Sequence, residues 1–181
     1  MKALRYTLVI IIAVVFCSCV SKNINDNEGH YVERRGGFSI LIPDAWQAIE
    51  VQDFQYKMLR GAFTNNFAPT INFVDEPFNR QFDEYVIYVT EELQKLFGDN
   101  IEFIVLSDFI TTKGLDGKII VITTYQQEKL IQLSFFLFPG DNRNRRNRGN
   151  NIIITCTSLA DEHEKYSALF IRTVRTFEWI R

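Results

Sequence analysis

The alternation of apolar and polar residues predicts several short strands in the first part of the chain. Residues 38–42 are mostly apolar, follow a glycine pair and stop at Pro43, which is typical of a strand. The segments after this proline are shorter and more polar. Weaker strands are expected at residues 46–51, 57–63 and 70–75.

From Phe82 onward the apolar residues recur every three or four positions, which predicts an amphipathic helix. Gly98 is expected to end it, because glycine readily adopts the backbone conformation that closes a helix. Charged residues such as Glu91, Glu92 and Lys95 fall on the opposite side. The apolar stripe consists of Phe82, Tyr85, Val86, Val89, Leu93, Leu96 and Phe97.

The second half of the chain predicts longer strands and a closing helix. Residues 135–138 are apolar at every position, as expected of a strand that is covered on both faces. Asp161 and Glu164 have the spacing of a capping box at the start of the last helix. The strands are expected at residues 101–112, 118–126, 129–138 and 151–159, and the helix face at Tyr166, Leu169, Phe170, Thr173, Val174 and Phe177. This order predicts a layered α+β fold.

The first residues of the chain have the pattern of an export signal. Lys2 and Arg5 precede an apolar run at residues 8–16, which is too short to cross about 30 Å of hydrocarbon. Residues 16–19 resemble the lipobox of bacterial lipoproteins, which implies that Cys19 becomes the lipid-bearing N-terminus. We therefore expect a signal peptide at residues 1–18, a lipidated Cys19 with a flexible tether to residue 30, and one folded domain at residues 31–181.

Composition narrows the possible functions. An apolar fraction of 46% and sixteen phenylalanines indicate a folded domain with a substantial core. The formal net charge is −2 and becomes more negative when Lys2 and Arg5 leave with the signal, which argues against nucleic-acid binding. With Cys17 removed and Cys19 lipidated, Cys156 is the remaining thiol, so no disulfide is expected.

The residue types that carry out catalysis are sparse and poorly spaced for it. His30 lies at the edge of the tether, His163 falls in an exposed helical turn, and Cys156 lies in an apolar strand where a thiol is inert. Residues 161–164 are rich in acids but lack the spacing of zinc-binding helices. Residues 114–117 lack the lysine of a phosphate-binding loop and predict a turn. We therefore expect no enzyme activity, no metal and no cofactor.

A basic segment between two predicted strands stands out on an otherwise acidic domain. It is polar throughout and contains Arg143, Arg145, Arg146 and Arg148. Such a loop could contact anionic lipid headgroups, at about 1 kcal/mol per cation, or an acidic protein partner. Loops of this composition are usually solvated and have no partner. Aromatic residues are absent from it, which argues against single-stranded nucleic acid.

Five segments, taken in their order along the chain, carry a family resemblance. They are residues 38–43 with Trp46 and Gln47, residues 70–74 with Glu76, residues 114–118, residues 152–157 and residues 174–177. Together they resemble the PsbP-like fold, and in particular the bacterial DcrB-like lipoproteins. The resemblance implies a central antiparallel β-sheet packed against helices in α/β/α layers. Relatives of this fold share binding to macromolecules, although a fold does not by itself fix a function.

These observations lead to one main hypothesis and two alternatives. The main hypothesis is a non-catalytic lipoprotein, anchored by lipid in the bacterial cell envelope outside the cytoplasm, that binds a protein partner as an accessory or assembly module. The first alternative is a small-ligand carrier with an apolar pocket between the sheet and the helices. The second is a hydrolase, which requires a carboxylate, a histidine and a hydroxyl within reach of one another.

Overall fold

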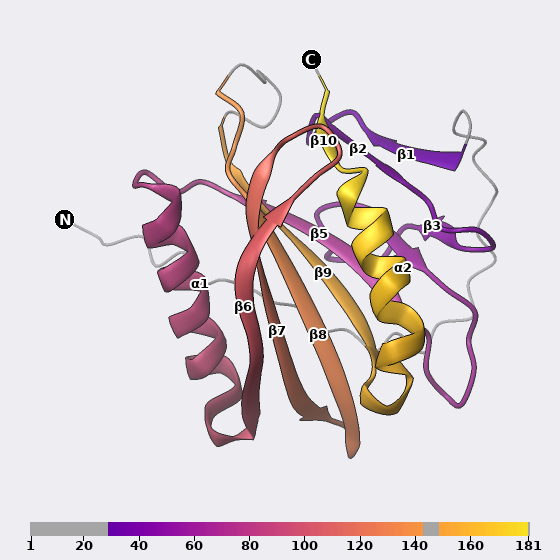
Figure 1. The fold of residues 1–181 in the computed structure, drawn as a ribbon. Coiled ribbons are helices and arrows are strands. Elements are labelled where there is room, and N and C mark those ends of the chain that lie inside the picture. The colour runs from indigo at the N-terminus through magenta and orange to yellow at the C-terminus, as the bar shows by residue number, and fades with distance from the viewer. Residues whose placement is uncertain (1–28, 143–148, 181) are drawn as a thin grey trace.

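A seven-stranded antiparallel sheet forms the centre of the protein (Figure 1). The computed structural model describes residues 29–142 and 149–180. The strand order is β3-β4-β5-β9-β8-β7-β6, so the long hairpin strands occupy one half of the sheet and the short early strands the other. The strands are β3 (Gln47–Ile49), β4 (Met58–Arg60), β5 (Thr70–Glu76), β6 (Ile101–Ile110), β7 (Asp116–Gln126), β8 (Lys129–Phe138) and β9 (Asn151–Leu159).

A smaller, three-stranded sheet packs beside the large one. It is made of β1 (His30–Glu33), β2 (Phe38–Leu41) and β10 (Glu178–Trp179), in the order β1-β2-β10. In this small sheet the first and last described strands lie on either side of β2, because β1 and β10 both pair with it. Trp179 also donates a hydrogen bond from Nε1 to the carbonyl oxygen of Pro139, at 3.1 Å.

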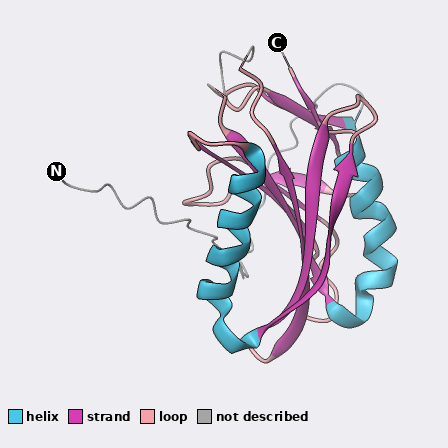
Figure 2. Ribbon diagram, turned by 60° about the vertical axis from the view of Figure 1, so that its left-hand side comes forward, coloured by secondary structure: helices cyan, strands magenta, loops and turns pink. Residues whose placement is uncertain are grey.

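Two helices cover opposite faces of the large sheet, as Figure 2 shows. The first is α1 (Phe82–Phe97), followed by a 3₁₀ turn at Gly98–Asn100, and the second is α2 (His163–Arg175), preceded by a 3₁₀ turn at Ala160–Glu162. Tyr85, Val86, Val89 and Leu93 are the buried residues of α1. The structure therefore has the expected α+β architecture, with an antiparallel sheet between helical layers.

The two faces of the sheet carry separate apolar cores. On the α2 side, aromatic side chains of the sheet pack against α2 and the small sheet, and the Phe138 and Phe177 rings stack with centroids 5.0 Å apart. On the α1 side, aliphatic residues of β7 and β8 meet the helix stripe. Residues 135–138 are fully buried and alternate between the two cores, which confirms the prediction that this strand is covered on both faces.

Most predicted elements are present, and the exceptions have local causes. The prediction of a capping box was wrong, because α2 begins at His163 after a 3₁₀ turn. Neither Asp161 nor any other described side chain caps this helix. Phe177 lies beyond the end of α2, although it is buried as its apolar character suggested. His30 is the first residue of a strand, paired with Leu41, instead of part of the tether.

Candidate interaction surface

The reactive residue types are placed where they stabilise the fold. Cys156 is completely buried on the α2 side of the sheet, and burial raises the pKa of its thiol, so the nucleophilic thiolate is disfavoured. His163 Nδ1 lies 3.5 Å from Ser158 Oγ, and burial lowers the pKa of this histidine despite the opposing effect of Glu164. Ser158 is also completely buried, so a substrate cannot reach its hydroxyl from solvent.

The acidic residues near α2 do not form a metal site. Within residues 29–142 and 149–180, no three His, Cys, Asp or Glu side chains are placed so that they could share an ion. None of the helices in that part of the chain is long and apolar enough to span a bilayer. Cys19 and the four arginines Arg143, Arg145, Arg146 and Arg148 lie outside the described residues.

A partly buried polar network lies between the small sheet and the end of β5. Tyr56 donates a hydrogen bond to Asp75 at 2.9 Å, and Asn150 donates to the other oxygen of the same carboxylate at 3.0 Å. Nearby, Tyr31 donates to Glu33 at 2.5 Å. Burial and the adjacent carboxylates raise the pKa of both tyrosines, so their hydroxyls remain protonated donors. This network fixes Asn150, the residue that directly precedes β9.

A second, partly buried acid lies on the opposite face. Tyr85 of α1 donates a hydrogen bond to Glu76 at 2.7 Å, which ties the helix to the end of β5. Burial raises the pKa of Glu76, and the hydrogen bond from Tyr85 partly opposes that effect. Each of these acids is engaged by a neighbouring side chain, so they are structural contacts.

The feature that packing does not explain is the exposed apolar surface of β6. Seven of its ten residues are apolar, yet Phe109 is the only residue of this strand that is buried. Leu106 is 61% exposed and Ile110 is 54% exposed. We call this region the β6 edge surface, and it comprises Phe103, Ile104, Val105, Leu106 and Ile110.

The β6 edge surface lies at the open end of the strand order. Among the described strands, β6 pairs with β7 alone, so its other side has no partner strand. The Thr111 N–H donates to the Leu115 carbonyl at the hairpin turn, and backbone bonding in an antiparallel pair alternates from residue to residue. The backbone groups of Leu106, Asp108 and Ile110 therefore point away from β7. A bulge between Phe103 and Val105 limits this regular edge to residues 105–110.

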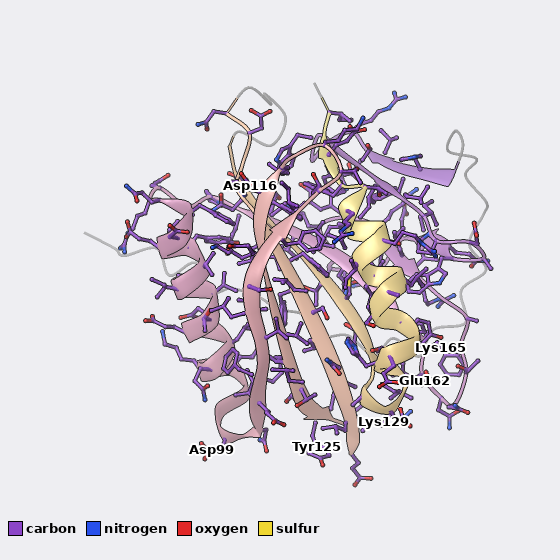
Figure 3. The ribbon with its side chains drawn as sticks, in the orientation of Figure 1. Asp99, Asp116, Tyr125, Lys129, Glu162 and Lys165 are labelled. Carbon is purple, nitrogen blue, oxygen red and sulfur yellow. The ribbon has the colours of Figure 1, made fainter. Side chains whose placement is uncertain are left out.

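Acidic side chains surround the β6 edge surface. Glu102 and Asp108 are exposed on the strand itself, and Figure 3 labels Asp99 and Asp116 at its two ends. Asp116 pairs with Ile110, and Asp99 comes two residues before the strand. Lys118 of β7 forms an ion pair with Asp108, and this contact raises the pKa of the lysine.

Sequence reasoning predicted this strand and missed its exposure. Residues 101–112 have the pattern of one more apolar strand, and their apolar residues alone do not distinguish an edge strand from a central one. A signal was nevertheless present, because Glu102 and Asp108 interrupt the strand with charge. Charged residues are one means by which proteins limit pairing at a sheet edge.

Comparison with known proteins shows the fold and not a family. No protein-family model matches the chain, and no curated protein matches it. A Mycobacterium tuberculosis protein, LpqN, described as involved in cell envelope biogenesis, has 14% identity and a TM-score of 0.60, covering 77% of this chain and 81% of its own.

Two other solved structures are similar. The PsbP protein of the cyanobacterium Synechocystis has 13% identity and a TM-score of 0.56, covering 91% of this chain and 98% of its own. The Ran-binding protein Mog1p of Saccharomyces cerevisiae has 12% identity and a TM-score of 0.52, covering 85% and 96%. At these identities the likeness concerns architecture alone, and it shows that the chain has a PsbP-like α+β fold.

Proposed function

We propose that this protein is a non-catalytic lipoprotein of the bacterial cell envelope that binds another macromolecule through the β6 edge surface. The observation that carries the proposal is an apolar strand left exposed at the end of a well-packed sheet. Contiguous exposed apolar surface is typical of sites that contact another protein or a membrane. The described role of LpqN in envelope biogenesis and the Ran binding of Mog1p support a binding module.

The placement of the reactive groups supports binding over hydrolysis. Ser158 and His163 lie near each other, but the serine is sealed inside the core. A nucleophile must reach both its base and its substrate. This pair therefore fails the requirement that the hydrolase alternative sets.

The anchor is a separate part of the proposal. Each buried methylene of an acyl chain contributes about 0.8 kcal/mol, and stable attachment needs more than one chain. A lipidated Cys19 would therefore hold the domain at a membrane surface. Replacing it in Cys19→Ala should move the protein from the membrane fraction to the soluble fraction. Retention of the variant in the membrane fraction would contradict the anchor.

The binding role is tested by photo-crosslinking in intact cells. A photoreactive amino acid replaces Leu106 in one strain and Phe63 in another. Phe63 is matched in exposure, at 58%, but lies between β4 and β5, toward the opposite edge of the sheet. We expect a discrete crosslinked species from position 106 and not from position 63. Equal, diffuse labelling at both positions would contradict a contact at the β6 edge surface.

A further inference from the structure

We propose that the occupant of the β6 edge surface is an extended, basic segment of a partner protein, which pairs with β6 as an additional strand of the sheet. This inference rests on the proposed function, since it specifies how the same surface binds. Backbone, side chains and charge each support it through a different observation.

The backbone supplies the first argument. Leu106, Asp108 and Ile110 direct their amide and carbonyl groups toward the open side of β6, as the bonding of Thr111 to Leu115 requires. These groups match the spacing of an incoming strand. In strand addition, main-chain hydrogen bonds hold the ligand and side-chain pockets select it.

The side chains supply the second argument. Val105 lies beside Val121 on the α2 side of the sheet, whereas Leu106 lies beside Ile120 on the α1 side. Exposed apolar groups therefore flank the edge on both faces. The side chains of an added strand alternate between the two faces, so both rows would find apolar neighbours. A helix laid against one face would leave the other face exposed.

Charge supplies the third argument and defines the chemistry of the partner. Glu102 and Asp108 lie on the strand, and Asp99 and Asp116 lie at its ends. The nearby lysines are engaged, because Lys118 pairs with Asp108 and Lys113 pairs with Glu178. The Asp108 side chain is nevertheless 89% exposed and free to meet a second cation. A segment with lysine or arginine between its apolar residues would be complementary.

The same charges argue against a second copy of this chain. β6 contains no lysine or arginine, so self-pairing would bring together two acidic strands without a cation on either. Like charges placed opposite each other weaken a strand pair. The partner must therefore supply the positive charge.

The test combines the crosslinker at position 106 with proline substitutions in the full-length protein in cells. Asp108→Pro removes an outward amide that β7 does not use, whereas Asp108→Ala removes the same carboxylate and keeps the amide. We expect the Ala variant to keep most of the crosslinking yield and the yield of the Pro variant to fall about tenfold. Ile110→Pro and Ile110→Ala repeat the comparison at the next outward amide, in case Asp108→Pro does not fold.

Each outcome decides between distinct possibilities. A loss specific to proline, together with mass spectrometry that places the crosslink in a lysine- or arginine-containing segment, supports strand addition. Equal yields in the Pro and Ala variants overturn it and leave side-chain binding in its place. A crosslink to a second copy overturns it in favour of self-association. The absence of any crosslinked species in the unsubstituted protein overturns the proposed function itself.

Discussion

Strands β8 and β6 are both ten residues long and each carries seven apolar residues, but their environments are opposite. In β8 eight consecutive residues, from Ile131 to Phe138, are buried. In β6 one residue, Phe109, is buried. β7 lies between them and pairs with both. One intervening strand therefore separates a strand in the packed core from a strand at the exposed edge.

The comparison shows that apolar content decides whether a strand forms, and strand order decides whether it is covered. β8 lies between β7 and β9 with an apolar core on each face. β6 contributes one anchoring ring, because Phe109 packs edge-on against Phe136 with centroids 4.7 Å apart. The remaining apolar residues of β6 are thus available for a partner.

The largest difference in stability is expected between truncation of a buried residue in β8 and truncation of an exposed residue in β6. Phe136→Ala in β8 removes a fully buried ring and should lower the free energy of unfolding by about 3–5 kcal/mol. Leu106→Ala in β6 removes an exposed side chain and should change it by less than about 0.5 kcal/mol. Urea denaturation measures both. Similar losses in the two variants would show that β6 is covered.

A smaller effect is expected where β7 joins the two regions. A Cβ added at Gly117 would collide with the carbonyl oxygen of Leu137 and the ring of Phe138. Gly117→Ala should therefore cost about 1–3 kcal/mol, since a packed core resists added volume. The same denaturation assay applies. An unchanged midpoint would mean that the packing between β7 and β8 is looser than the structure indicates.

The partly buried Glu76 at the end of β5 gives a pH-dependent prediction. Burial raises the pKa of Glu76 above its ordinary value of 4.5, so between the two values the folded state retains a proton that the unfolded state has lost. The free energy of unfolding therefore falls as pH rises through this window. Glu76→Gln keeps an acceptor for Tyr85 without the charge, and should be more stable than the original at neutral pH.

This advantage should shrink as the pH falls from neutral through the raised pKa of Glu76, and should be lost below about 4.5, because Glu76 is then protonated in both the folded and the unfolded original protein. Urea midpoints of both proteins, measured at neutral and at acidic pH, give the comparison. If the urea midpoints of the two proteins differ by the same amount at every pH, the burial of the Glu76 charge is not the cause of the difference.

The smallest effect on stability is expected at the β6 edge surface. Leu106→Lys places a charge on an exposed position and should change the free energy of unfolding by less than about 0.5 kcal/mol. Urea denaturation of the original and substituted proteins measures this change. A destabilised Leu106→Lys variant would indicate that Leu106 belongs to a core.

The sequence was sufficient to predict β8 and β9 to the residue and α1 from its apolar stripe. It missed β1 and β10, because four and two residues are too few to show a period. The start of α2 was misjudged because a 3₁₀ turn occupies the predicted cap. The candidate surface was missed for a different reason. Pairing of β5 with β9 determines which strand is left at the edge, and that pairing joins residues about 80 positions apart, too distant for a local pattern.

The central prediction is that β6 keeps a free backbone edge until a partner covers it. Residue-resolved amide hydrogen exchange of the isolated protein tests this directly. The amides of Leu106, Asp108 and Ile110 should exchange rapidly, while those of Ser107 and Phe109, bonded to β7, should be protected. Slow exchange at all five amides in the monomer would contradict the claim, because the edge would then already be paired.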